Sequence, residues 1–274
     1  LDKAKQPASA MDYIFAGDLL NQCIGSSFGL RDFSIPFFGL YGACSTMGES
    51  LALAAMLIDG GFAEKAAAQA SSHFCTAERQ YRMPVPYGSQ RTPTAQWTAT
   101  AAGCTLLSAQ GPGPYITHVT CGKIVDKGIT DPNNMGAAMA PAAASTLLHY
   151  FADTHTEPQE FDCIYTGDLG QVGSSLLREL LAAEGLLVKN HVDCGCILFD
   201  AAEQQVKSGG SGPGCCAAVL CGHILPRLLR RSQKRVLFVA TGALMSQTTF
   251  LQKESIPAVA HLVELRAPEK ESGA

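Results

Sequence analysis

Tyr41-Gly-Ala-Cys-Ser-Thr-Met-Gly-Glu-Ser50 is the stretch around which the chain is organised. The apolar segment 35–40 before it predicts a strand, and apolar residues at helical spacing after it predict a helix that ends at Gly60-Gly61. Cys44 therefore falls in a strand-to-helix turn, where free N–H groups and the helix dipole favour a negatively charged nucleophile. The alternative is that Cys44 is only a small, buried hydrophobic residue.

The length, composition and charge of the chain limit which kinds of protein it can be. The chain has 274 residues, of which 47% are hydrophobic and 16% charged, which is enough for one large core or two fused ones. A net charge of −4 predicts no nucleic-acid partner. No apolar run approaches the length that spans a bilayer, and no signal-peptide pattern opens the chain. The eleven scattered cysteines are typical of reduced cytosolic thiols, and without paired Cys-x-x-Cys motifs they predict no zinc site.

Strands and helices are predicted to alternate along the rest of the chain. We expect helices at 135–151, at 174–184 and from Cys215, and strands at 12–19, 66–72, 161–169, 235–241 and 258–266. Segments 97–109 and 116–126 alternate like two paired strands joined by the turn Gly111-Pro-Gly-Pro114. This order favours an α/β fold with mostly parallel sheets.

The pattern also repeats itself. Asp12-x-Ile-x-x-Gly-Asp-Leu19 matches Asp162-x-Ile-x-x-Gly-Asp-Leu169, and the strand into Ser71-Ser72-His73 matches the strand into Thr241-Gly242-Ala243. The Cys44 turn corresponds to the Gly-rich turn 209–214. Three correspondences in the same order indicate a duplicated α/β half. Two such halves would place their equivalent turns in one interior cleft, which collects Cys44, His73, Gly167, Asp168 and Ser211.

Motifs along the whole chain carry a resemblance to a known family. They are Gly17-Asp-Leu-Leu-Asn-Gln22, Gly42-Ala-Cys-Ser-Thr46, Ser71-Ser-His73, Ala77-Glu-Arg-Gln80, Asn134-Met-Gly-Ala-Ala-Met-Ala-Pro-Ala-Ala143, Thr166-Gly-Asp-Leu-Gly170, Gly209-Gly-Ser-Gly212, Ala240-Thr-Gly-Ala-Leu244 and His261. Together they resemble the stage V sporulation protein AD family of the thiolase and ketoacyl-synthase superfamily. The resemblance implies two thiolase-like halves, 1–112 and 113–274, with mixed, mostly parallel sheets and helices sandwiched in five layers, α-β-α-β-α. It further implies a strand and helices before Leu1, and we expect that strand to lie inside the first sheet.

The resemblance also implies a function. Members are sporulation proteins that bind dipicolinate (pyridine-2,6-dicarboxylate) or its calcium complex and, with other stage V sporulation proteins, move it into the developing spore. It implies a cytoplasmic protein held at the forespore membrane by its partners, and a homodimer is a further expectation. Condensing enzymes of the superfamily carry a His and an Asn or His where this chain reads Thr166-Gly167-Asp168 and Gly210-Ser211-Gly212. We therefore expect a binding pocket without turnover; the alternative is an acyltransferase that uses Cys44 as its nucleophile.

The residues expected to meet the ligand have different chemistry. Two arginines, Arg79 and Arg82, suit bidentate pairing with carboxylates, and the Gly-rich helix start offers N–H donors from Gly210, Ser211 and Gly212. His73 is expected to lie beside the pocket as a ligand-binding residue, and it could in principle serve as a substitute base for Cys44. The alternatives are a solvated loop for the arginines, close packing for the glycines and a structural role for His73.

Two aspartates and a basic stretch are the other charged residues that bear on a ligand or partner. Asp18 and Asp168 occupy equivalent turns, where Asp18 is expected to cap a helix. Asp168 would repel a bare carboxylate, so we expect a calcium ion to accompany the ligand if Asp168 faces it, and no other cofactor. A basic stretch is either an exposed helix end or a docking site for a partner or membrane; it comprises Arg227, Arg230, Arg231, Lys234 and Arg235.

Overall fold

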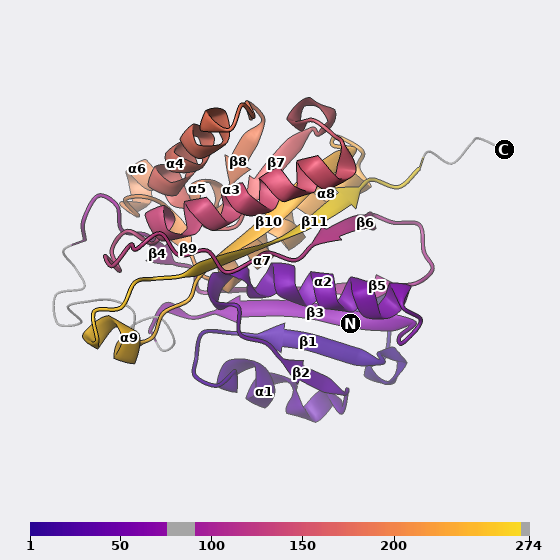
Figure 1. Cartoon of the computed structure of the whole chain (residues 1–274). Helices are drawn as coiled ribbons and strands as arrows, with labels where there is room; N and C mark the ends of the chain where they lie inside the picture. Colours follow the sequence, from indigo (N-terminus) through magenta and orange to yellow (C-terminus); the bar gives the residue numbers. More distant parts are fainter. Residues whose placement is uncertain (76–90, 270–274) are drawn as a thin grey trace.

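Two β-sheets form the framework of the chain (Figure 1). The computed structural model describes residues 1–75 and 91–269. The first sheet has the order β2-β1-β3-β5, with β1 (Tyr13–Gly17), β2 (Phe37–Gly39), β3 (Lys65–Ser72) and β5 (Ala101–Ser108). The second has the order β6-β11-β10-β7-β8, with β6 (Tyr115–Thr120), β7 (Cys163–Thr166), β8 (His191–Asp193), β10 (Arg235–Ala243) and β11 (Ala258–Arg266). A short parallel ladder of β4 (Trp97–Thr98) and β9 (Gly210–Ser211) joins the two halves of the chain.

Helices cover both sheets and fill the space between them. The α-helices are α1 (Ile24–Leu30), α2 (Thr46–Asp59), α3 (Met135–Thr154), α4 (Gly170–Ala183), α5 (Cys194–Leu198), α6 (Ala201–Gln204), α7 (Pro213–Val219), α8 (Leu225–Leu229) and α9 (Gln247–Leu251). Short 3-10 turns lie at Asp2–Ala4, Ala8–Ala10, Arg31–Phe33, Ala43–Ser45 and Pro158–Glu160, and a π-helical turn, η9, spans Leu220–Ile224.

The layers follow the predicted order. Helix α1 packs on the outer side of the first sheet, α2 and α7 lie between the sheets, and α3 and α4 cover the second sheet (Figure 1). Helix α2 contacts β1 and β3 on one side and β10 and β11 on the other. The five-layered, thiolase-like α/β architecture expected from the sequence is confirmed.

The duplication is visible in the strand order. In the first sheet β1 is parallel to β3, and β3 pairs antiparallel with β5. In the second sheet β7 is parallel to β10, and β10 pairs antiparallel with β11. The repeated Gly-Asp-Leu segments therefore follow topologically equivalent strands, β1 and β7, as the internal repeat predicts.

Two expectations about pairing were wrong. Strands β5 and β6 do not form a hairpin, because β5 pairs with β3 in the first sheet and β6 with β11 in the second. The turn at 111–114 instead carries the chain from one half to the other. The first sheet is also hydrogen-bonded without a gap from β2 to β5. The position that β6 fills beside β11 has its counterpart at the outer edge of β5, so an additional strand would belong at that edge and not inside the sheet.

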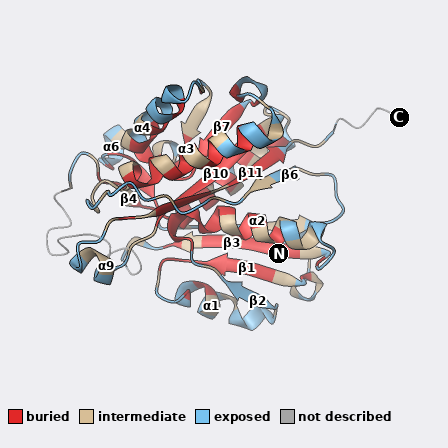
Figure 2. Ribbon diagram, viewed as in Figure 1, coloured by how far each residue is buried: buried red, intermediate tan, exposed pale blue. Residues whose placement is uncertain are grey.

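The core runs through both halves (Figure 2). One cluster of buried side chains contains Phe15 and Met47 from the first half together with Tyr165 and Phe238 from the second. Glycines bring the layers into backbone contact: a Cβ on Gly48 of α2 would lie 2.7 Å from the Cβ of Ala240. No helix within the described ranges is long and apolar enough to cross a membrane.

A buried carboxylate on β11 anchors the second sheet. Glu264 has a fully buried side chain, and its Oε1 lies 2.6 Å from Arg235 Nε and 2.7 Å from Arg266 Nε. Its Oε2 accepts a hydrogen bond from the Tyr150 hydroxyl at 2.5 Å and lies 2.7 Å from His118 Nδ1. These partners hold the pKa of Glu264 at about 2, against the effect of burial.

Candidate functional site

The turn around Cys44 is tightly held and strained. A 3-10 turn (Ala43–Ser45) precedes α2, so Cys44 stands just before the helix as predicted, with only 6% of its surface exposed. Ala43 has φ 51°, a left-handed conformation that is unfavourable for a residue with a Cβ. The turn is fixed by its own side chains: Thr46 Oγ1 donates to Ala43 O at 2.7 Å and Ser45 Oγ to Gly42 O at 2.6 Å. Such strain is found most often at functional sites.

Asp168 is the centre of the site. It is 1% exposed, and its Oδ2 accepts hydrogen bonds from Ser211 Oγ at 3.0 Å and Gly212 N at 2.9 Å. Its Oδ1 accepts from Thr241 Oγ1 at 3.0 Å. The Cys44 thiol also hydrogen-bonds Asp168, and Cys44 Sγ lies 3.9 Å from Ser211 Oγ. Burial raises the pKa of Asp168, although these hydrogen bonds oppose the rise.

The Gly-rich turn is partly engaged within the protein. We expected its N–H groups to hold a ligand carboxylate, but the Gly212 N–H already donates to Asp168. Gln96 also fixes the position of this turn, because its Nε2 donates hydrogen bonds to Asp168 O at 2.5 Å and to Gly210 O at 2.9 Å. Gly167 packs closely against β10, since a Cβ there would lie 2.9 Å from Thr241 N. The predicted meeting of Cys44, Asp168 and Ser211 is nevertheless found.

The remaining predicted residues are placed differently. His73 directly follows β3 and is exposed, whereas Ser72 before it is buried and accepts a hydrogen bond from Gly214 N at 3.1 Å. Ser72 is thus the residue of this segment that contacts the Gly-rich turn. A role for His73 as a base stays a prediction. Arg79 and Arg82 lie outside the described residues.

The two equivalent aspartates have diverged. Asp18 caps α1 as expected: its Oδ2 accepts from both Ser26 N and Ser26 Oγ at 2.7 Å, and its Oδ1 accepts from Leu20 N at 2.9 Å. Asp168 does not cap α4, the helix that follows it, and instead connects β7 to β10 and to Gly212 at the start of α7. Within the described ranges, no group of three or more His, Cys, Asp or Glu side chains is arranged to hold a metal ion.

Asp193 takes over the capping that Asp168 gives up, and the sequence analysis missed it. Its carboxylate accepts hydrogen bonds from Leu169 N at 2.8 Å and Gly170 N at 2.9 Å, at the start of α4. It also accepts from Thr166 Oγ1 at 2.6 Å. Burial raises the pKa of Asp193 to about 7. Asp193 directly precedes helix α5, and an Asp at this position is a common N-cap, so the sequence did contain a signal for a capping role.

A cationic side chain lies on an aromatic stack next to the Gly-rich turn. The Arg91 guanidinium carbon is 3.5 Å from the centre of the Trp97 ring, and Trp97 stacks on Phe74 at 4.2 Å. Trp97 pairs with Gly210, so the stack adjoins the residues that hold Asp168. Two guanidinium nitrogens of Arg91, Nε and Nη1, are buried without a hydrogen-bond partner. Burial lowers the pKa of Arg91, yet an arginine remains charged.

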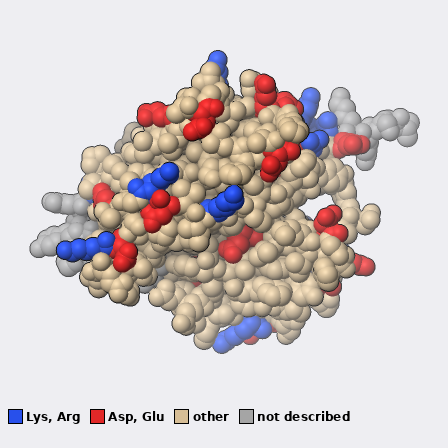
Figure 3. Space-filling view, viewed as in Figure 1, with Lys and Arg blue, Asp and Glu red and all other residues tan. Residues whose placement is uncertain are grey.

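All eleven cysteines are free, as expected for reduced thiols. On the molecular face drawn in Figure 3, acidic and basic side chains are interspersed and no single-sign patch is formed. The basic stretch predicted from the sequence does not act as one surface. Arg235 is paired with Glu264, and Arg227 is half-buried beside His223.

Comparison with solved structures supports the fold. The tetronic acid condensing enzyme AbyA1 superposes with a TM-score of 0.63 at 16% identity, covering 97% of this chain and 82% of the other. The 3-oxoacyl-[acyl-carrier-protein] synthase III of Aquifex aeolicus gives 0.61 at 12% identity, covering 97% and 80%. A variant of OleA from Xanthomonas campestris, with bound lauric acid and lauroyl-CoA, gives 0.64 at 10% identity, covering 97% and 79%.

Sequence comparison identifies the family of the chain. The stage V sporulation protein AD of Bacillus subtilis (strain 168) is 46% identical over 263 residues, which cover 95% of this chain and 77% of that protein. The family model for stage V sporulation protein AD (SpoVAD) matches residues 1–266. With the thiolase-like fold, the Cys44 turn and the Asp168 centre all in place, the chain belongs to the stage V sporulation protein AD family.

Proposed function

We propose that this chain binds dipicolinate beside the Cys44 turn and takes part in its uptake into the developing spore. Family membership supports a role in sporulation. The charge of dipicolinate determines what its site must provide. Dipicolinate is a dianion at neutral pH, and burying it without a counter-charge would be prohibitive.

Arg91 is the observation that carries this proposal. Its guanidinium lies on Trp97 and has two buried nitrogens without partners, so it has donors to offer a carboxylate. Trp97 lies between Arg91 and Phe74, so the outer face of Phe74 is the flat apolar surface of this stack that suits the pyridine ring. Asp168 does not compete for Arg91, because its oxygens accept hydrogen bonds from Ser211, Gly212 and Thr241.

We expect Arg91→Gln to weaken dipicolinate binding tenfold or more, because a charged hydrogen-bond donor contributes about 1.5–3 kcal/mol. Calorimetric titration of the wild type and the variant measures the loss. Arg31→Gln is the matched control, since Arg31 is 65% exposed and paired with Asp32, and it should bind like the wild type. A folded Arg91→Gln variant with unchanged affinity would refute the role of Arg91, and a wild type without measurable affinity would refute the proposal.

An acyltransferase using Cys44 is the second candidate, favoured by the strained Ala43 next to a cysteine at a helix start. Against it, the thiol lies beside the carboxylate of Asp168 and the hydroxyl of Ser211, and neither is the imidazole that activates a catalytic cysteine. Incubation with acyl-coenzyme A thioesters followed by mass spectrometry separates the two candidates. We expect no acyl group on Cys44 and only modestly weaker dipicolinate binding in Cys44→Ala. A stable adduct on Cys44 would favour the enzyme.

Calcium is proposed to arrive as part of the ligand. Because the Asp168 oxygens are engaged within the protein, the ion would be held chiefly by the carboxylates of dipicolinate. Titrations with and without a chelator, on wild type and Asp168→Asn, test this. A calcium dependence that disappears only in Asp168→Asn would assign the ion to Asp168 instead.

The proposed partners are other stage V sporulation proteins, which would hold the chain at the forespore membrane, and a second copy of the chain. A set of exposed apolar side chains around edge strand β2 suits the second copy; it comprises Ile24, Phe28, Phe33, Phe37, Phe38 and Tyr41. Sedimentation velocity measures the association. A monomer at all accessible concentrations would contradict the dimer.

A further inference from the structure

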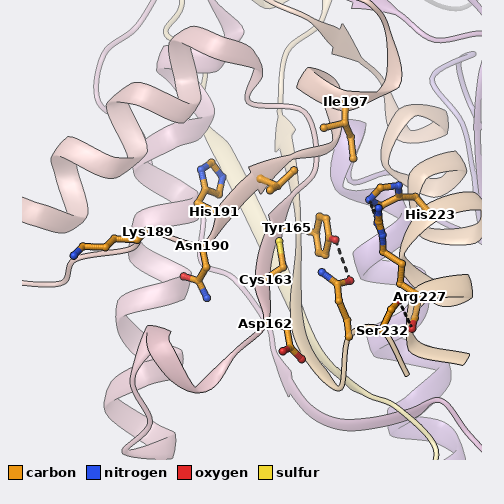
Figure 4. Close-up of a pocket in the computed structure, with 12 residues that line it drawn as sticks. Asp162, Cys163, Tyr165, Lys189, Asn190, His191, Ile197, His223, Arg227 and Ser232 are labelled. Atoms are coloured by element: carbon orange, nitrogen blue, oxygen red, sulfur yellow. Dashed lines mark hydrogen bonds between the residues drawn. The ribbon is translucent and has the colours of Figure 1, made fainter. Parts of the chain in front are cut away.

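A pocket lies beside β7 and β8, and Figure 4 shows the residues that line it. Its wall includes Asp162, which precedes β7, whereas Asp168 of the site described above follows the same strand. The pocket has a volume of about 640 Å³. Small-molecule sites have volumes of about 300–1,000 Å³. No residue argued to hold dipicolinate lines this pocket.

The polar wall is built on the π-helical turn η9, a rare backbone form that often marks functional sites. It places the His223 ring edge-on against Tyr165, with centroids 6.1 Å apart. Arg227 Nη1 lies 3.0 Å from His223 Nε2. Arg227 can only donate, so His223 accepts through Nε2 and is neutral. Burial, and after it the Arg227 charge, lower the pKa of His223, in agreement with this.

The positive charge of Arg227 has no counter-ion in the described part of the chain: no carboxylate lies within 4.0 Å of its guanidinium. The pocket's own carboxylate, Asp162, accepts hydrogen bonds from the backbone N–H groups of Lys234 at 2.6 Å and Arg235 at 2.9 Å. Since one guanidinium nitrogen serves His223, Nε and Nη2 of half-buried Arg227 stay available to an anion.

Further donors and an apolar wall face this guanidinium. The Tyr165 hydroxyl donates to Gln233 Oε1 at 3.1 Å, so the amide NH₂ of Gln233 is left as a donor. Cys163, Val192 and the 40% exposed Ile197 supply apolar lining. His191 also lines the pocket, and its Nε2 lies 2.8 Å from Thr166 Oγ1.

We propose that this pocket binds a small organic carboxylate. Arg227 holds the carboxylate with help from the Gln233 amide, and Cys163, Val192 and Ile197 contact the apolar body of the ligand. An inorganic anion would meet the guanidinium but leave the apolar wall uncovered, so it binds more weakly. Arg227 thus belongs to a ligand site.

Benzoate is a suitable probe, and inorganic phosphate is the comparison. We expect benzoate to shift the ¹⁵N resonances of the His223 imidazole in a saturable way and to bind at least tenfold more tightly than phosphate. Arg227→Gln should weaken benzoate binding at least tenfold. Arg227→Lys keeps the positive charge but loses the bidentate geometry of the guanidinium, and it should give an intermediate affinity.

Two controls keep the test specific. Arg230→Gln removes an exposed charge from the same basic stretch and should change benzoate affinity less than twofold. Arg91→Gln removes the cation of the proposed dipicolinate site and should leave benzoate at His223 unaffected. The proposal is overturned if benzoate produces no saturable shift at His223. It is equally overturned if folded Arg227→Gln and Arg227→Lys both bind benzoate as tightly as Arg230→Gln.

Discussion

Replacing Glu264 by glutamine is expected to lower the free energy of unfolding by about 3 kcal/mol, the low end of the cost of breaking a buried ion pair. The carboxylate is fully buried, and its loss leaves the guanidinium of Arg235, 19% exposed, without its closest partner. The Tyr150 hydroxyl is also deprived of a charged acceptor. Chemical denaturation of the wild type and the variant, monitored by circular dichroism, measures the difference.

Glu160 provides the matched control for this prediction. Its carboxylate lies 3.1 Å from the same Arg235 but is 47% exposed, so Glu160→Gln should cost about 0–1 kcal/mol. Equal losses for the two variants would contradict the argument from burial.

The same network predicts a pH dependence. The pKa of Glu264 is about 2 in the folded chain. In the unfolded chain a glutamate has a pKa of about 4.3. The folded state therefore binds fewer protons in this window, so its stabilisation is complete above pH about 4.3 and is lost as the pH falls towards 2. Acid titration of stability should show this loss in the wild type and not in Glu264→Gln.

Asp168→Ala is expected to have a comparable effect on stability and a larger one on the site. The substitution leaves the Gly212 N–H and the hydroxyls of Ser211 and Thr241 without their acceptor. An unsatisfied buried donor costs about 1–3 kcal/mol, and hydroxyls recover part of this by rotating, so we expect a total loss of about 3 kcal/mol. Because the Gly-rich turn is released from β7, dipicolinate binding should fall below detection. Denaturation and calorimetry of the variant give the two values.

Asp18→Ala is the control at the equivalent turn of the first half. Asp18 acts as a helix cap, so its removal should cost about 1–2 kcal/mol and leave ligand binding unchanged. Loss of binding in both variants would show that the two turns are not specialised in the way the hydrogen bonds indicate.

Sequence patterns predicted the architecture well where they are local. The apolar run before Cys44, the Ala-rich helix α3 and the final strand β11 were all expected from the local sequence pattern. The internal repeat was decisive, because it predicted that turns distant in sequence would meet. Cys44, Asp168 and Ser211 do meet.

Long-range pairing and side-chain direction could not be predicted in the same way. Alternation in 97–109 and 116–126 is equally compatible with one hairpin or with the edges of two sheets, and only the packing of the whole duplicated chain decides. Ser72 and His73 are adjacent polar residues at the end of β3, where Ser72 is buried and His73 is exposed. Successive residues of a strand point to opposite faces, but the small residues of β3 give no hydrophobic alternation that shows which face is buried. Arg91 precedes its strand by several residues, so no periodicity placed it on Trp97.

The glycine contacts of the central helices limit how the two halves can move. A Cβ on Gly48 would meet Ala240, and a Cβ on Gly103 of β5 would lie 2.4 Å from Ala217 O in α7. At these glycines the backbone of one half packs directly against the other half, beside the long side chains, such as Met47 and Phe238, that form the shared core. Rocking of one half against the other would break close-packed contacts all along the seam. We therefore infer that the halves form one mechanical body, and that a ligand enters through movement of surface loops and not by a hinge between the halves.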